Sequence, residues 1–177
     1  MGMQTVKRKA IEVIMIILFF LLETTVFQYL EIASIKPNLL VILTASFGFM
    51  RGKNEGMFVG FLSGFLLDLC FSRYIGFYTL LYSVIGYVNG FFKRLYYSDD
   101  MKLPLLLISG SELIYGLWVY VFQFMLQSDF HFLYYLGHII MPELVYTILV
   151  TLILYQIILR INRRLEDEEK RSASKFV

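Results

Sequence analysis

Four glycines recur at every fourth position of this chain, and an acid takes the next place in the series: Gly52, Gly56, Gly60, Gly64 and Asp68. Residues four apart lie on one face of a helix, so the stretch predicts a helix with a groove free of side chains that ends at a carboxylate. At 1.5 Å per residue the groove is about 24 Å long, most of the hydrocarbon core of a bilayer. In water, each interior glycine would cost such a helix about 1 kcal/mol relative to alanine, whereas in lipid small residues at this spacing let a second helix approach closely. The stretch therefore favours helix packing within a membrane.

The glycine face has two interpretations. In the favoured interpretation, the glycine face packs against another helix of the same bundle. In the alternative, it forms a docking face for a separate membrane protein. Steps of four residues drift by about 40° on a straight helix, so the groove winds and suits a crossing helix. A second pair, Gly86 and Gly90, lies in a later apolar segment and is expected to serve the same kind of contact.

The composition places the chain among polytopic membrane proteins. Of its 177 residues, 58% are hydrophobic and only 17% are charged, and the mean hydropathy is positive. A soluble domain of this length would carry more charge. The predicted fold is an all-α integral membrane protein, with a bundle of six transmembrane helices in residues 1–160 and a charged cytoplasmic tail in residues 161–177.

Two of the six expected spans are irregular. The second has only 12 unbroken apolar residues, Leu39–Met50, which is too short to cross a bilayer by itself. The sixth is interrupted by Pro142, so we expect residues 130–141 to form a separate or kinked piece at the outer surface. The expected spans are residues 11–30, 39–50, 56–71, 77–92, 103–126 and 132–159.

The basic residues predict the orientation of the bundle. With six spans and the N-terminus in the cytoplasm, only Lys36 and Arg73 of the 16 Lys and Arg residues fall outside. Cytoplasmic loops carry an excess of these residues, so we expect both termini in the cytoplasm.

Four acids are predicted to lie within the membrane: Glu23, Asp68, Glu112 and Glu143. A carboxylate there costs about 2.5–3.5 kcal/mol, so such residues usually face the interior of a bundle. Three roles are open: hydrogen bonds that fix helix packing, the lining of a ligand pocket open to the outside, and a proton relay. Packing is the favoured role. Glu143 directly follows Pro142, where it is expected to cap the start of a helix.

No pattern of catalytic or cofactor-binding residues is present in the sequence. Two histidines, His131 and His138, and the single cysteine, Cys70, do not have the spacing of a metal site. There is no phosphate-binding loop and no Ser-His-Asp arrangement. We therefore expect no enzyme activity, no cofactor and no nucleic-acid partner, with an intramembrane acid catalyst built on Asp68 or Glu112 as the alternative.

Three stretches resemble the MreD family, the rod-shape-determining membrane proteins of bacteria. The string Lys36-Pro37-Asn38-Leu39-Leu40 is similar to the opening of that family's second helix, and the run from Arg51 to Asp68 is similar to its central motif. The block Gly76-x-Tyr78-Thr79-Leu80-x-Tyr82-xxx-Gly86-xxx-Gly90 resembles the block that follows. The residues that carry the resemblance are Pro37, Asn38, Arg51, Gly76 and Tyr82, together with the glycine series.

The resemblance implies a role in the elongation of the lateral cell wall. MreD proteins are non-catalytic subunits of the bacterial cytoplasmic membrane that support peptidoglycan synthesis. They associate with MreC, a single-span protein with an extracytoplasmic coiled coil. Through it they connect to MreB filaments and to the polymerase RodA with its transpeptidase. On this basis the glycine face of residues 52–64 is expected to support either the bundle or the contact with an MreC-like helix.

An alternative function comes from a more distant likeness. The MreD family looks similar to the S components of energy-coupling-factor vitamin transporters, which also have six helices. An S-component-like protein would bind a small molecule in a pocket open to the outside, near the four acids. Binding of a vitamin by the purified protein distinguishes this alternative from the scaffold.

Overall fold

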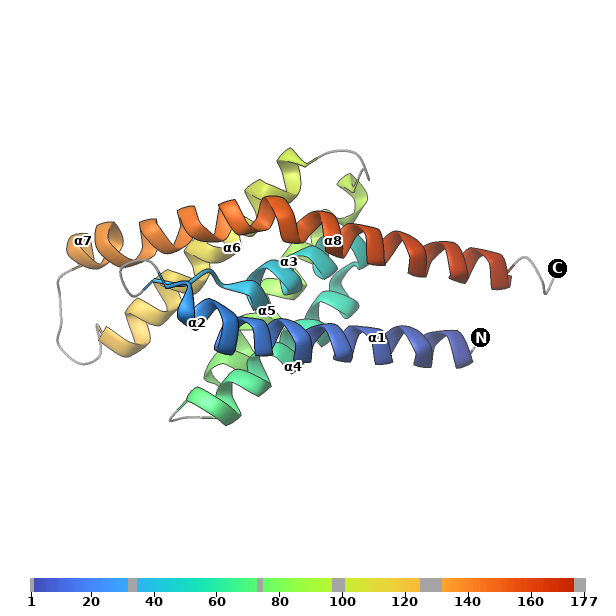
Figure 1. The fold of residues 1–177 in the computed structure, drawn as a ribbon, viewed down its shortest axis with the longest axis horizontal. Coiled ribbons are helices and arrows are strands. Elements are labelled where there is room, and N and C mark those ends of the chain that lie inside the picture. Colours follow the sequence, from blue (N-terminus) through green and yellow to red (C-terminus); the bar gives the residue numbers. More distant parts are fainter. Residues whose placement is uncertain (1, 32–34, 73–74, 97–100, 125–131, 174–177) are drawn as a thin grey trace.

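The computed structural model describes the whole chain except residues 1, 32–34, 73–74, 97–100, 125–131 and 174–177. His131 lies outside the described residues. The described residues form an all-helical bundle in which both termini lie at the same end (Figure 1). We call this end the termini end.

Six helical rods make up the described part of the bundle, some of them with π or 3-10 turns at one end. They are α1 (Gly2–Leu21) with π turns at Leu22–Val26 and α2 (Phe27–Tyr29); α3 (Leu39–Arg51); α4 (Lys53–Phe71); α5 (Phe77–Asn89) with a 3-10 turn at Gly90–Leu95; α6 (Lys102–Val119) with π turns at Tyr120–Phe124; and α7 (Phe132–Tyr135), π turns at Leu136–Ile140 and α8 (Met141–Ala173).

Four stretches of the described chain are long and apolar enough to cross a membrane: Val6–Tyr29, Lys53–Phe71, Lys102–Phe122 and Phe132–Arg171. All six expected helical segments are present in the described chain. Only four of them are long and apolar enough to span a membrane by themselves. The helix α8 has 33 residues, about 50 Å, so it extends well beyond a bilayer core at the termini end.

The short helix α3 lies inside the bundle. Every residue from Leu39 to Met50 is buried, because α1, α4, α5, α6 and α8 all pack against this helix. Its 13 residues rise about 20 Å, two thirds of a bilayer core. A helix surrounded by protein on all sides does not need to reach both membrane surfaces, which explains how so short an apolar segment belongs to the fold.

The glycine face of α4 packs against α5, which covers it. A Cβ atom added at Gly56 would overlap the carbonyl oxygen of Gly86, and one added at Gly60 would overlap that of Tyr82. At Gly64 it would overlap the first turn of α5. The two backbones therefore touch directly, and the helix that fills the groove belongs to the same chain.

Gly52 starts the glycine series but has another role. It is the single residue between α3 and α4, and its φ of 104° lies in the left-handed region that favours glycine. This residue makes the tight turn that lets α4 reverse against α3.

Residues 130–141 were expected to form a separate or kinked piece, and for the described residues 132–141 the separate piece is wrong. The helical run is continuous from Phe132 to Ala173. Pro142 lacks an N–H and would clash with the preceding turn of a regular α-helix. The preceding turns are π-helical, and the Met141 N–H bonds to the Leu136 carbonyl five residues back. This wider turn accommodates the proline without ending the helix.

We predict that Gly60→Ala destabilises the protein, whereas Gly110→Ala does not. An alanine Cβ at position 60 would overlap the Tyr82 carbonyl, while nothing lies within 4 Å of a Cβ at position 110. Both sites are helical, so the change in helix propensity is the same. Overpacking of this kind costs about 1–3 kcal/mol. Thermal unfolding in detergent, followed by size-exclusion chromatography, measures the difference, and equal stability of the two variants would contradict the packing of α4 on α5.

Candidate functional site

The acid that ends the glycine series holds the start of α5. The side chain of Asp68 is buried. Its Oδ1 accepts the N–H of Tyr78 at 2.9 Å, and its Oδ2 accepts the N–H groups of Gly76 and Thr79, each at 2.9 Å. The Thr79 hydroxyl donates to Oδ2 as well. The first N–H groups of a helix have no partner within it, and a negative charge is favoured there, so Asp68 caps α5 from the end of α4.

Gly76 has a specific conformation at this cap. Its φ of 108° is left-handed, and it is the residue directly before α5. This backbone turn brings its N–H onto the carboxylate of Asp68. This conformation explains why a glycine stands at position 76, because residues that carry a side chain rarely adopt it.

Glu23 serves the buried start of α3 in a similar way. Its Oε2 accepts the N–H of Leu40 at 3.0 Å. Glu23 comes from the π turns that follow α1, at Leu22–Val26. The start of α3 lies inside the bundle, where no water is available to accept hydrogen bonds from its free N–H groups. The side chain of Glu23, from a neighbouring helical segment, accepts one of these hydrogen bonds instead.

Asn38 completes the start of α3 and ties it to two other helices. Its Oδ1 accepts the N–H of Val41 at 3.1 Å and the hydroxyl of Tyr82 at 2.8 Å. Its backbone N–H donates to the Thr147 hydroxyl of α8 at 3.2 Å. The motif residues Asn38 and Tyr82 are therefore in direct contact, about which the sequence analysis made no prediction. Thr147 was not singled out at all, because a threonine in an apolar span has no distinguishing signal.

Glu112 lies in the same interior but caps no helix. Its side chain is buried, and neither carboxyl oxygen has a hydrogen-bond partner within the part of the chain that the structure describes. The carboxyls of Glu143 and Glu23 are near enough to act on it electrostatically. Glu143 was expected to cap a helix that begins at Pro142, but the continuous helical run leaves no free helix start there.

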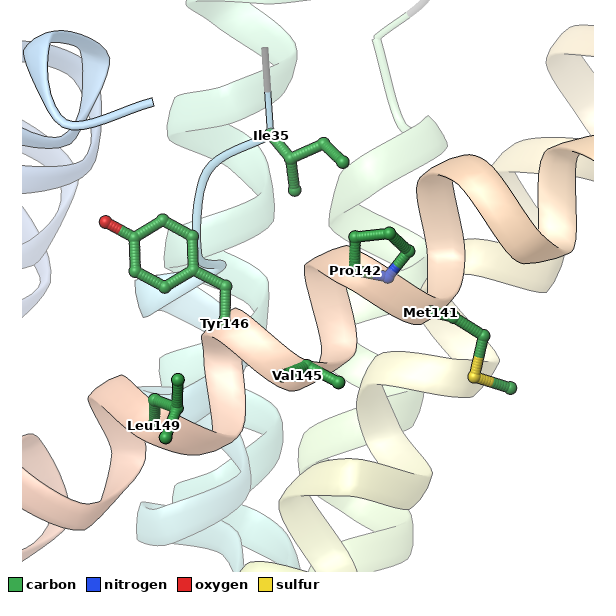
Figure 2. Close-up of a pocket in the computed structure, with 6 residues that line it drawn as sticks. All are labelled: Ile35, Met141, Pro142, Val145, Tyr146 and Leu149. Carbon is green, nitrogen blue, oxygen red and sulfur yellow. The ribbon is translucent and has the colours of Figure 1, made fainter. Parts of the chain in front are cut away.

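An apolar cavity of about 420 Å³ lies beside the start of α8. Figure 2 shows its lining residues, which are Ile35, Met141, Pro142, Val145, Tyr146 and Leu149. None of the four acids that were expected within the membrane lines this cavity. The Tyr146 hydroxyl donates to the Leu30 carbonyl at 3.0 Å, which ties α8 to the end of the first rod. This cavity therefore gives no support to the alternative in which the acids line a ligand pocket.

Ion pairs join α1, α4 and α8 at the termini end. The Arg8 guanidinium lies 2.7 Å from a Glu55 oxygen and 3.3 Å from a Glu169 oxygen. Lys9 pairs with Glu55 and with the buried Glu12. Several charges thus share partners across three helices, an arrangement that contributes more than isolated surface pairs do.

Arg51 joins the end of α3 to α8. Its Nε donates to the Asn162 Oδ1 at 2.5 Å, and its Nη1 donates to the two Glu169 oxygens at 3.1 and 3.0 Å. The Arg51 side chain is only 8% exposed. Residues 161–177 were expected to form a charged tail. The helix α8 continues into this segment as far as Ala173, and its contacts with α3 and α1 were not predicted.

The chain was compared with protein families, curated proteins and solved structures. The family model described as rod shape-determining protein MreD matches residues 7–164, which include the glycine series, the caps and Arg51. No curated protein and no solved structure matches. The expected likeness to S components therefore stays a prediction.

We predict that Asp68→Asn lowers thermal stability and that Glu112→Gln does not. An asparagine at position 68 offers one acceptor oxygen instead of two, and its amide N–H groups would face backbone donors. Leaving buried donors unpaired costs about 1–3 kcal/mol. Glu112 has no hydrogen bond to lose within the described chain. Unfolding midpoints of both variants in one detergent measure the contrast, and a larger loss at position 112 than at position 68 would contradict the assigned roles.

We also predict that Glu169→Gln loosens the end of α8, whereas Glu168→Gln leaves it in place. Glu169 binds Arg8 and Arg51, whose side chain is nearly buried. Glu168 pairs with Lys7, and the side chains of this pair are about half exposed, Glu168 at 50% and Lys7 at 57%. Exposed pairs contribute about 0–1 kcal/mol. Limited trypsin digestion in detergent should cleave at Arg163 and Arg164 several-fold faster in Glu169→Gln. Equal cleavage rates in the two variants would mean that Arg51 does not hold the helix.

Proposed function

Because this chain belongs to the MreD family of rod shape-determining proteins, we propose that it is a non-catalytic membrane scaffold of the bacterial cell-elongation machinery. The family match over residues 7–164 is the observation that carries the proposal. The polar contacts add physical support, since Glu23, Asn38 and Asp68 accept hydrogen bonds from the backbone N–H groups at helix starts. Side chains used in this way give the bundle one fixed shape, as a scaffold requires.

We place the protein in the bacterial cytoplasmic membrane as a multi-pass protein with the termini end in the cytoplasm. The two termini are joined by ion pairs such as Arg8 with Glu169, so the same side of the membrane holds both. The basic residues concentrate at this end, and Lys and Arg are enriched on the cytoplasmic side of membrane proteins.

The proposed partner is an MreC-like single-span protein that links the bundle to MreB filaments, RodA and its transpeptidase. The glycine face of α4 is filled by α5, so the partner helix docks on another surface of the bundle. The glycines then act on docking indirectly, because they fix the α4–α5 pair. A substitution at Gly60 would disturb the partner contact through the fold of the bundle and not through lost contact atoms.

Cell shape tests this function. In a rod-shaped bacterium that carries this chain as its only copy, depletion should produce round cells and stop the insertion of fluorescent D-amino acids along the lateral wall. The wild-type chain and Gly110→Ala should restore rods, and Gly60→Leu should not. Depleted cells that stay rod-shaped and keep lateral insertion would refute the proposal. Purified protein that retains a vitamin would instead favour the S-component alternative.

A further inference from the structure

A basic pocket of about 560 Å³ opens at the termini end, between the start of α4 and the 3-10 turn that follows α5. It is separate from the buried caps and from the apolar cavity of Figure 2. No acidic residue is among its described lining residues. The lining residues include Arg51, Lys53, Asn54, Phe91, Lys93 and Arg94.

Two of these cations are not neutralised within the described chain. Lys93 and Arg94 are exposed, and neither has an ion-pair partner among the described residues. Lys53 is also directed into this region, with its Nζ 3.5 Å from the centre of the Phe91 ring. Several positive charges without an acid between them attract and concentrate anions.

Close backbone packing brings these cations together. A Cβ at Gly90 would overlap the backbone of Lys53, and one at Gly52 would lie 3.0 Å from the Lys93 Cδ. The start of α4 and the end of α5 therefore meet without intervening side chains. Gly52, the first glycine of the α4 series, and Gly90, the second of the α5 pair, both line the pocket.

The base of the pocket offers further donors. The 19-residue helix α4 begins at Lys53, and the preceding Gly52 provides no side-chain cap, so the first N–H groups of α4 can donate to an anion. Arg51 lies next to them, with a side chain that is only 8% exposed. Its Nη2 group is buried and has no hydrogen-bond partner among the described residues. A buried guanidinium N–H without a partner costs free energy that a bound anion would recover.

We propose that this basic pocket binds the phosphate of an anionic phospholipid headgroup. The pocket lies at the termini end of the apolar helices α4 and α5, which the proposed orientation puts at the cytoplasmic membrane surface, and the exposed Phe91 is one of its lining residues. A lipid bound here would keep its acyl chains against these helices while its phosphate meets Lys93, Arg94 and the start of α4. Basic pockets between helices on the cytoplasmic side are suited to such headgroups. The proposal requires membrane insertion but not the role in cell shape.

Lipid titration of the purified full chain tests the site. The detergent-solubilised protein is titrated with phosphatidylglycerol or with phosphatidylcholine of the same acyl chains, and native mass spectrometry measures the occupancy. The pocket variant is Lys93→Gln with Arg94→Gln. The control is Arg160→Gln with Arg164→Gln, which removes the same charge from exposed positions on α8 outside the pocket.

The wild type and the control should prefer phosphatidylglycerol, and the pocket variant should bind it about tenfold more weakly. Equal loss in both double variants, or no preference for phosphatidylglycerol in the wild type, would overturn the proposal. Inorganic phosphate is added as a competitor. If millimolar phosphate displaces the lipid fully, the lipid assignment fails and the pocket is a site for free phosphate. Weak competition, with the lipid retained, supports the headgroup.

Discussion

The free N–H groups at two helix starts impose the constraint on which the rest of this structure depends. Those of α3 lie inside the bundle, where no water is available, and those of α5 lie in a partly buried first turn, so both need acceptors from neighbouring side chains. Asp68 supplies the acceptor for α5, and Glu23 with Asn38 supplies it for α3. The carboxylates of Asp68 and Glu23 are thereby used where a helix start favours a negative charge.

The glycine groove and the Asp68 cap work as one unit. The groove lets α5 lie directly on the backbone of α4, and the cap at its end holds the first turn of α5 in that position. At the other end Gly52 turns the chain and Arg51 ties α3 to α8. The core is thus fixed at both ends by polar contacts.

Much of this fold follows from sequence patterns, and the failures have physical causes. The glycine spacing predicted a close helix contact, but spacing on one helix does not identify the helix that fills the groove. The interior acids were recognised, yet only the tertiary arrangement decides that Asp68 meets the start of α5 while Glu112 meets no donor in the described chain. Pro142 was expected to separate or kink the residues before it. The continuous helical run was not predicted, because the π turn that accommodates the proline leaves no mark in the sequence. The contact of Glu169 with Arg51 was missed because a charged segment after an apolar span normally remains in water.

Affinity purification tests the scaffold function most directly. The tagged full-length chain is isolated from its own bacterium in mild detergent, and the bound proteins are identified by mass spectrometry, with Gly110→Ala as a matched control. The account predicts that wild type and control both enrich a single-span membrane protein with an extracytoplasmic coiled coil. Enrichment of an energising ATPase module, with no such single-span protein in either sample, would contradict it.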